Sequence, residues 1–328
     1  MKTIRWGIIG CGDVTEVKSG PGFQKAEHSA LVAVMRRNGD LAQDYAQRHG
    51  VPRWYDNAEA LIHDPEVDAV YIATPPYAHL DYTRQVAQAG KPVYVEKPMA
   101  RTHAECQAMI DACHAANVPL FVAYYRRALP RFVKIKELVQ GGTLGEVRTV
   151  NIFLARPLDL FPPENLPWRV VPELSGGGHF VDLASHTLDF LDDVLGPIRV
   201  AQGMASNQGG AYPAEDVVTG HFVFESGVQG VGTWCSAAHV WQDWCEIIGS
   251  HGQLRFSSFG NDPVILTAAD GQTKFEINHP PHVQQPLIQT VVNTLNGVGE
   301  CPSTGESAAR ASWVIDQLLA SYRQQRGL

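Results

Sequence analysis

Residues 93–98 read Val93-Tyr94-Val95-Glu96-Lys97-Pro98, an apolar run that ends in a charged pair followed by proline. The run predicts a short buried strand. Pro98 disfavours helical geometry at Lys97, so the turn after the strand has a defined shape. Ligands of open α/β sheets bind outside the carboxyl ends of the strands, which is where Glu96 and Lys97 stand. An isolated Glu-Lys-Pro would more simply end a strand in water, so the interpretation depends on the surrounding sequence.

Length and composition predict a globular chain of two domains. The chain has 328 residues, of which 45% are apolar and 18% charged, and its net charge is -8. This length suits two domains of roughly 120 to 200 residues each, and we place them at 1–123 and 124–328. The acidic balance argues against a nucleic-acid partner, which normally meets a basic patch.

Targeting and cysteine patterns predict a cytoplasmic protein. No apolar segment is long enough for a signal peptide or a membrane span, so we expect no membrane partner. The six cysteines show no Cys-x-x-Cys and no metal-like spacing with histidine. Free thiols in a reducing compartment, without a metal site, are the expectation.

Strands and helices alternate through the first domain. The apolar runs predict strands at 3–9, 30–35, 67–73, 93–95 and 119–123, and a further short strand is expected at 53–55. Helical patterns lie between them, at 39–49, 58–62, 79–89 and 102–116. This alternation predicts a doubly wound parallel sheet. The second domain reads differently, with a helix at 130–139 and then strands at 146–154, 199–205, 217–224, 228–234, 243–249, 253–257 and 264–268, before a last helix at 306–325.

A glycine turn follows the first strand. Gly10-Cys11-Gly12 leads directly into Asp13 and Val14, which would open a helix whose backbone N–H groups meet a pyrophosphate. Thr15 stands where the third glycine of G-x-G-x-x-G would be, and glycine turns without a ligand are common. Gly20-Pro21-Gly22, within residues 18–23, predicts a break after one helical turn. We expect a loop there that reaches over the nicotinamide end of a cofactor.

The end of the second strand bears on the choice of cofactor. Arg36 and Arg37 stand where an NAD-binding fold usually carries Asp or Glu, and arginine there accommodates a 2′-phosphate. NADP(H) is therefore favoured, with NAD(H) possible, although arginines after a strand are often simply solvated. Thr74-Pro75-Pro76, followed by His79, predicts a rigid loop suited to a flat ring or a ribose, or else a tight turn before a helix.

A second group of polar residues follows Gly176-Gly177-Gly178, which reads as a turn opening a helix. Asp182 and His186 are separated by four positions, so they project from one helix face. A carboxylate beside an imidazole orients it and raises its pKa, as a base working near neutral pH requires. The alternative is an ordinary surface pair.

The glycine turn, the Thr-Pro-Pro-x-x-His segment and Glu96-Lys97-Pro98, in this order, resemble the Gfo/Idh/MocA oxidoreductases. The resemblance implies an N-terminal Rossmann domain and a C-terminal α/β domain built on a large, mostly antiparallel open sheet. It also implies that Lys97 touches cofactor and substrate and that Asp182 and His186 complete a Lys-Asp-His site. Trp168-Arg169 resembles a segment that closes over the nicotinamide in relatives. The sheet face commonly pairs subunits in this family, so we expect a homodimer or homotetramer.

The resulting hypothesis is a hydride transfer to or from a sugar, anhydrosugar, polyol or related carbonyl or hydroxyl compound. The alternatives are a dihydrodiol or non-sugar carbonyl oxidoreductase, and a cofactor-binding sensor or regulator without catalysis. Three tryptophans, Trp234, Trp241 and Trp244, would suit either sugar platforms or packing.

Overall fold

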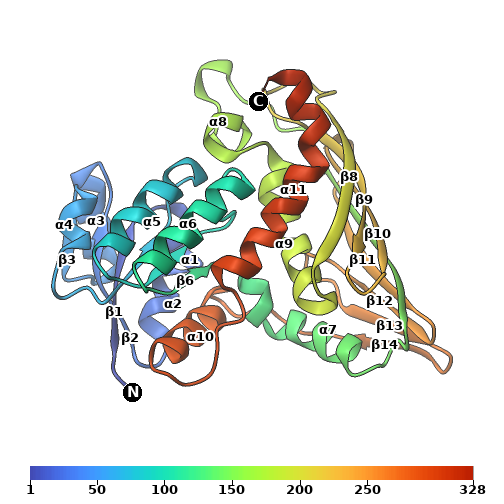
Figure 1. The fold of residues 1–328 in the computed structure, drawn as a ribbon, viewed down its shortest axis with the longest axis horizontal. Helices are drawn as coiled ribbons and strands as arrows, with labels where there is room; N and C mark the ends of the chain where they lie inside the picture. Colours follow the sequence, from blue (N-terminus) through green and yellow to red (C-terminus); the bar gives the residue numbers. More distant parts are fainter. Residues whose placement is uncertain (328) are drawn as a thin grey trace. The chain divides into compact units, whose positions relative to one another are not determined.

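The structure is a computed structural model that describes residues 1–327, and it contains two compact units (Figure 1). Unit 1 comprises Met1–Ala100, Ala104–Leu129 and Pro280–Ala309. Unit 2 comprises Arg101–His103, Pro130–His279 and the described chain from Arg310 onward. The units are therefore interleaved in the sequence. The predicted boundary between a cofactor-binding domain and a substrate-binding domain at residue 123 stays a prediction.

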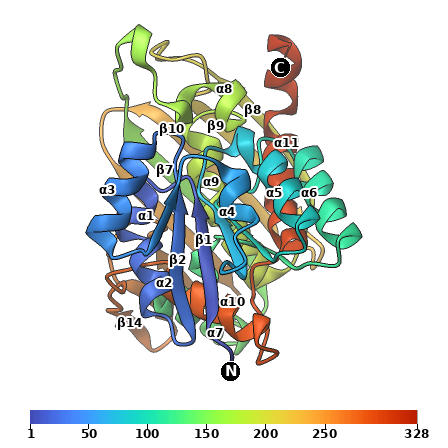
Figure 2. The same cartoon turned by 90° about the vertical axis from the view of Figure 1, so that its left-hand side faces the viewer.

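Unit 1 is built on a six-stranded parallel sheet in the order β3-β2-β1-β4-β5-β6. Its strands are β1 (Ile4–Ile9), β2 (Ser29–Met35), β3 (Arg53–Tyr55), β4 (Ala69–Ile72), β5 (Val93–Val95) and β6 (Leu120–Val122). β1 and β2 lie side by side in Figure 2. This order is that of the dinucleotide-binding doubly wound sheet, so the predicted fold class is confirmed.

Helices cover both faces of this sheet because successive side chains of a strand point to opposite sides. Ile9 packs in one buried apolar cluster, and its neighbour Ile8 packs in another. The helices and short 3₁₀ turns of unit 1 are α1 (Asp13–Val17), α2 (Gly20–Lys25), α3 (Gly39–His49), α4 (Ala58–Ile62), η1 (Pro76–Ala78), α5 (His79–Gln88), α6 (His103–Ala115), η2 (Tyr125–Ala128) and α10 (Gln285–Leu295).

The segment at 18–23 differs from its prediction. Helix α1 does end after one turn, but the chain then forms α2 instead of a loop over the cofactor. Pro21 stands in the first turn of α2, where its missing N–H costs nothing. Phe23 is fully buried, with its ring centroid 4.9 Å from that of Trp6. Packing of the apolar side chain against the sheet therefore outweighs the helix-breaking glycines.

Helix α10 was not predicted, although its pattern is amphipathic. Leu287, Ile288, Val291 and Val292 are all fully buried. A Cβ on Gly22 of α2 would lie 3.0 Å from Ile288 Cδ1, so α10 packs closely on α2. Residues 280–309 thus complete the core of unit 1.

Unit 2 contains an eight-stranded sheet in the order β14-β13-β12-β11-β7-β10-β9-β8. β7 and β10 run parallel and every other neighbouring pair is antiparallel, so the expected mostly antiparallel sheet is confirmed. The strands are β7 (Val147–Pro157), β8 (Ile198–Ser206), β9 (Val217–Phe224), β10 (Gln229–Ala238), β11 (Gln242–Gly249), β12 (Gly252–Phe256), β13 (Val264–Ala268) and β14 (Gly271–Phe275). The sequence did not predict β14, which is a mostly exposed edge strand with little apolar pattern.

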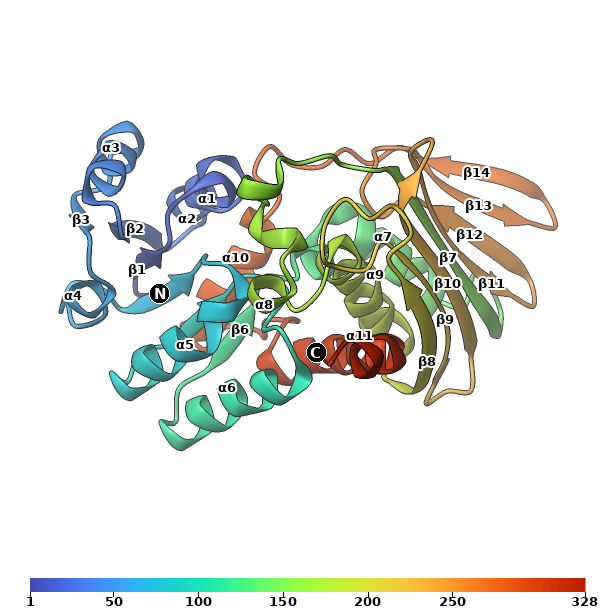
Figure 3. The ribbon, with the colours of Figure 1, turned by 90° about the horizontal axis from the view of Figure 1, so that it is seen from above.

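One face of this sheet is covered and the other is open (Figures 1 and 3). The covering helices are α7 (Pro130–Gln140), α9 (His179–Leu195) and the part of α11 (Gly305–Arg326) that belongs to unit 2. A Cβ on Gly203 would lie 2.7 Å from Leu318 O of α11, so Gly203 faces the helices. Met204, the next residue, therefore points to the open face, where it is 78% exposed. The remaining short elements are η3 (Pro163–Asn165), η4 (Trp168–Val170) and α8 (Pro172–Ser175).

Residues 1–327 contain neither a candidate membrane span nor a candidate metal cluster. None of the helices described is long and apolar enough to cross a bilayer. Within the same residues, no group of three or more His, Cys, Asp or Glu side chains is placed to hold a metal ion.

Candidate functional site

The carboxyl edge of the unit 1 sheet brings together four of the predicted cofactor-binding segments. Parallel strands end at the same edge, so the segments after β1, β2, β4 and β5 meet there. The backbone N–H of Gly10 donates to Met35 O at 2.8 Å, which ties the glycine turn to the end of β2. The N–H of Glu96 donates to Ile72 O at 2.8 Å and ties the end of β5 to β4.

The glycine turn leaves space for a ligand. Gly10 has φ +90, and a Cβ there would lie 2.8 Å from Thr74 Cγ2, so only glycine fits. A Cβ on Gly12 would meet nothing closer than Gly10 O at 3.9 Å, so this side of the turn is open. Thr15, in place of the third glycine, caps the turn: its Oγ1 accepts from Gly12 N at 2.9 Å. These residues, with Asp13 and Val14 behind them, fit a pyrophosphate.

Arg36 and Arg37 are exposed at the end of β2, beside the glycine turn. Within residues 1–327, neither guanidinium has a hydrogen-bond or ion-pair partner. Burial raises the pKa of the Cys11 thiol to about 11, and the positive charge of Arg36 opposes this rise. Arg36 is therefore within electrostatic reach of the turn that would hold the cofactor phosphates.

The Thr-Pro-Pro segment forms a rigid turn, but the side chain of His79 has a different role from the one expected. Pro75 and Pro76 lead into η1, and His79 begins α5. The His79 ring is fully buried, with Nε2 2.7 Å from Thr74 O and Nδ1 3.0 Å from Met99 O. Burial lowers its pKa. His79 thus fixes the loop from behind, and its part in binding the cofactor stays a prediction.

Glu96 also points into unit 1, away from the position expected of a cofactor ligand. Its carboxylate is buried and accepts from the Tyr71 hydroxyl, from Gln284 Nε2 at 2.5 Å and from Lys97 N at 2.9 Å. Burial, together with the Glu96 charge, raises the pKa of Tyr71 well above its usual value. Glu96 therefore anchors the backbone of Lys97, which is partly exposed at the sheet edge. Gln284 lies far away in the sequence, and no local pattern could have indicated it.

In unit 2, the predicted glycine turn and helix are confirmed. Gly176 has φ +84, and a Cβ there would lie 2.4 Å from Arg101 O. Gly178 precedes α9, and its N–H donates to Glu215 Oε1 at 2.7 Å. Glu215 is buried, which raises its pKa to about 7. This contact fixes the start of the helix that carries Asp182 and His186.

Asp182 and His186 stand one turn apart on α9, as their spacing predicts. Arg169 Nε lies 3.6 Å from Asp182 Oδ2, and its guanidinium stacks 4.4 Å from the ring centroid of Trp168. His186 is 3% exposed, and the ring of Phe259 meets its ring edge-on at 6.0 Å. The structure thus brings Trp168, Arg169 and Asp182 together within unit 2.

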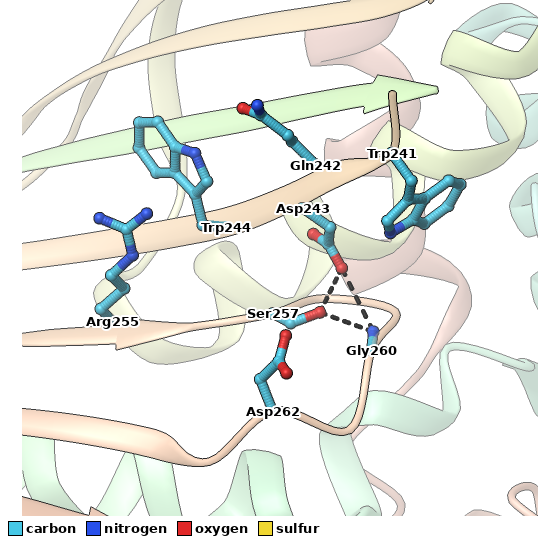
Figure 4. Close-up of a pocket in the computed structure, with 8 residues that line it drawn as sticks. All are labelled: Trp241, Gln242, Asp243, Trp244, Arg255, Ser257, Gly260 and Asp262. Atoms are coloured by element: carbon cyan, nitrogen blue, oxygen red, sulfur yellow. Dashed lines mark hydrogen bonds between the residues drawn. The ribbon is translucent and has the colours of Figure 1, made fainter. Parts of the chain in front are cut away.

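Asp243 holds the turn that carries Phe259 (Figure 4). Its carboxylate accepts from the Ser257 hydroxyl, from Phe259 N at 2.6 Å and from Gly260 N at 3.3 Å. One side chain therefore fixes the wall beside His186. No local pattern could have indicated this pairing, because β11 and the turn after β12 meet only in the folded sheet.

A pocket of about 410 Å³ adjoins this turn (Figure 4). Its lining residues are Trp241, Gln242, Asp243, Trp244, Arg255, Ser257, Gly260 and Asp262. Trp241 is 51% exposed, whereas Trp244 stacks on Phe153 with ring centroids 5.4 Å apart. Trp234 is buried against Phe180, so it belongs to the core and offers no platform.

Together, the doubly wound sheet with an open glycine turn and the second domain with its Asp-His helix define an NAD(P)-binding oxidoreductase. Residues 4–124 match the model of the oxidoreductase family with an NAD-binding Rossmann fold, and residues 132–255 match the GFO/IDH/MocA C-terminal domain. The chain belongs to the Gfo/Idh/MocA family of oxidoreductases, whose activity is NAD(P)-dependent and directed at CH–OH groups.

Known relatives cover nearly the whole chain. Oxidoreductase P35 of Formosa agariphila is 41% identical over 95% of this chain and 97% of its own length. The 1,5-anhydro-D-fructose reductase of Ensifer adhaerens is 27% identical over 92% of this chain and 91% of its own length. Among solved structures, an aldose-aldose oxidoreductase from Caulobacter crescentus, complexed with glycerol, has a TM-score of 0.86 and 26% identity, covering 99% of each chain.

Proposed function

We propose that this protein transfers a hydride between NADP(H) and a sugar, anhydrosugar, polyol or related compound, with Lys97, Asp182 and His186 as its catalytic residues. The observation that carries the proposal is the placement of Asp182 and His186 one turn apart on α9, a helix that begins directly after the glycine turn, with Arg169 beside Asp182. The anhydrofructose reductase and the aldose-aldose oxidoreductase, which are named for sugar substrates, support this substrate class.

In the proposed chemistry the hydride moves to or from the cofactor, and side chains transfer the proton and stabilise the developing charge. A bound nicotinamide supplies or accepts the hydride. In oxidation, His186 takes the proton of the substrate hydroxyl, and in reduction it returns a proton to the developing alkoxide. The Lys97 ammonium holds and polarises the same substrate oxygen. Asp182 orients His186 and stabilises its charged form.

The cofactor would be held by the residues at the carboxyl edge of the unit 1 sheet. Gly10, Gly12, Asp13 and Val14 would face the pyrophosphate, and Arg36 with Arg37 the adenosine end. Thr74, Pro75 and Pro76 form the rigid turn proposed to lie against ribose or ring. Trp168 and Arg169, whose side chains stack on each other, are proposed to cover the nicotinamide.

A substrate panel tests this function. Sugars, anhydrosugars, inositols and diols would be offered with each cofactor, and the absorbance of reduced nicotinamide would be followed. We expect turnover of at least one polyhydroxy compound. Turnover of dihydrodiols alone would favour the dihydrodiol alternative. Cofactor binding without turnover of any compound would favour a sensor or regulator.

Cofactor choice is expected to reverse when Arg36 is replaced by aspartate. A guanidinium makes charge-assisted hydrogen bonds to phosphate of roughly 1.5 to 3 kcal/mol each. One such contact favours NADP(H) by roughly tenfold to a hundredfold. Arg36→Asp removes it and adds repulsion, so the ratio of kcat/KM for the two cofactors should invert. Arg37→Asp, at the adjacent position, is the control and should change the ratio less. A native preference for NAD(H) would contradict the proposal.

The open face of the unit 2 sheet is proposed to pair subunits as a homodimer or homotetramer. Met204 on β8 is 78% and Val231 on β10 is 52% exposed there, and exposed apolar side chains on an open sheet face are typical of interfaces. Light scattering should give the mass of a dimer or tetramer, and glutamate at both positions should shift it toward the monomer. A monomeric native protein would contradict this assembly.

A further inference from the structure

Four polar side chains of unit 2 gather where β7 ends and α9 begins. They are Arg156 near the end of β7, Asp159 just after it, His179 at the start of α9, and Tyr212. Residues 152 and 154 of β7 are buried beneath the helices, so Arg156, two positions further, points to the same side. The rings of His179 and Tyr212 meet edge-on, with centroids 5.7 Å apart.

The hydrogen bonds of this group fix the protonation of His179. Arg156 Nη1 lies 2.9 Å from His179 Nδ1, and because a guanidinium only donates, Nδ1 is the acceptor. The proton of the neutral ring therefore stands on Nε2. Burial, with the positive charge of Arg156, lowers the pKa of His179 to about 4, so the ring is neutral at neutral pH.

Several donors of the group lack acceptors. Arg156 Nη2 donates to Asp159 Oδ2 at 2.6 Å, but Arg156 Nε is buried and has no partner in the described chain. His179 Nε2 is 3.2 Å from the same Asp159 oxygen without the geometry of a hydrogen bond. The Tyr212 hydroxyl is likewise buried and unpartnered among residues 1–327. Buried donors without acceptors are unfavourable, so a bound group rich in acceptors would stabilise this cluster.

The free donors suit a carboxylate better than a hydroxyl. A carboxylate only accepts hydrogen bonds, with two oxygens and about four lone-pair positions, whereas a hydroxyl also brings a donor that needs its own partner. Nε and Nη2 form the edge of a guanidinium that binds carboxylates through two parallel bonds. Asp159 accepts only from Nη2 and leaves Nε without a partner among the residues described, and its side chain is 35% exposed.

The cluster of Arg156, Asp159, His179 and Tyr212 lies at the start of the helix that carries the proposed catalytic residues Asp182 and His186. His179, Asp182 and His186 are separated by three and four positions, so they follow one face of α9. At about 1.5 Å per residue, His179 and His186 lie roughly 10 Å apart along the helix axis. A sugar ring with a carboxylate substituent is long enough to place one end near each of them.

We propose that Arg156, with His179 and Tyr212, binds the carboxylate of an acidic sugar, which makes the substrate a uronate or an aldonate. The inference rests on the proposed function and narrows its substrate class. Asp159 holds the position of the substrate carboxylate until the substrate displaces it. Arg156 is then a residue that determines specificity, while proton transfer remains with His186.

Matched pairs of acidic and neutral sugars test this assignment. We would measure kcat/KM for D-glucuronate against D-glucose, D-galacturonate against D-galactose, and D-gluconate against D-glucitol. The native enzyme should prefer the acid in at least one pair. In Arg156→Met the acid-to-neutral ratio should fall by roughly tenfold to a hundredfold, the effect of one charge-assisted contact. Asp159→Asn should raise the ratio by lowering KM for the acid.

Two controls separate binding from stability. Arg148→Met makes the same substitution on the same strand, where Arg148 pairs with the exposed Glu146, and should leave the ratio unchanged. Thermal unfolding of each variant would identify loss of fold. If Arg156→Met and Asp159→Asn lowered activity equally on acids and neutral sugars, the ion pair would be structural and the inference overturned. Turnover of neutral sugars alone would overturn it while leaving the proposed function intact, and no turnover of either class would overturn both.

Discussion

Lys97→Ala is expected to lose roughly a hundredfold to a thousandfold in kcat while the protein still folds and binds cofactor. An effect of this size is usual when one group that stabilises developing charge is removed. The ammonium is proposed to polarise the substrate oxygen, whose negative charge grows as the hydride moves. Single-turnover kinetics, with cofactor binding measured by fluorescence, would separate a chemical defect from a binding defect.

Lys91→Ala is the matched control for Lys97. Lys91 stands two positions before β5, and Lys97 two positions after it, so the two lysines flank opposite ends of one strand. Lys91 donates to Asp64 O at 2.8 Å, so its loss should lower stability slightly and leave kcat unchanged. The assignment of Lys97 would be wrong if its alanine variant turned over substrate at the native rate.

Replacing His186 with alanine is expected to slow oxidation by roughly a hundredfold or more, the usual contribution of a general base. The base must be neutral to accept a proton, so oxidation should rise with pH through the pKa of His186 in the native enzyme. That rise should disappear in His186→Ala. The measurement is kcat/KM against pH, and His221→Ala, on an exposed position of β9, is the control.

Asp182→Asn should have a smaller effect that nonetheless identifies the pair. A nearby carboxylate favours the charged imidazolium, so its removal lowers the pKa of the imidazole. The rising limb of the pH profile should therefore move to lower pH, while the limiting rate falls less than in His186→Ala. Unaltered profiles in both variants would show that the pair is structural.

The architecture of both units was predictable because it depends on local patterns. Apolar runs indicated five of the six parallel strands of unit 1, all but the short β3, and Gly176–Gly178 indicated the start of α9. The sequence failed at Gly20–Phe23, where propensity alone predicts a loop but burial of Phe23 makes a helix. Local propensity is a weak prior wherever tertiary packing provides more stabilisation.

For the candidate site, the sequence predicted where residues lie in the fold better than it predicted where their side chains point. Glu96 and His79 lie near the carboxyl edge of the sheet, as predicted. Their side chains, however, point inward, that of Glu96 onto Tyr71 and that of His79 onto Thr74 O. Pairs such as Arg156 with His179 join segments that are separated in the chain, and no periodicity encodes them. The two catalytic candidates on α9 were predictable because a single helix holds both.

The interleaving of the units sets an order of events during synthesis. Unit 1 lacks α10 until the ribosome has passed residue 295, although its six strands are complete by Val122. Until then, the apolar surface of α2 that receives Ile288 has no cover. Domains generally fold as units as the chain emerges, N-terminal first. Here the N-terminal unit cannot finish first, so its completed nucleotide-binding sheet keeps an uncovered apolar surface at α2 while the whole of the second sheet is made.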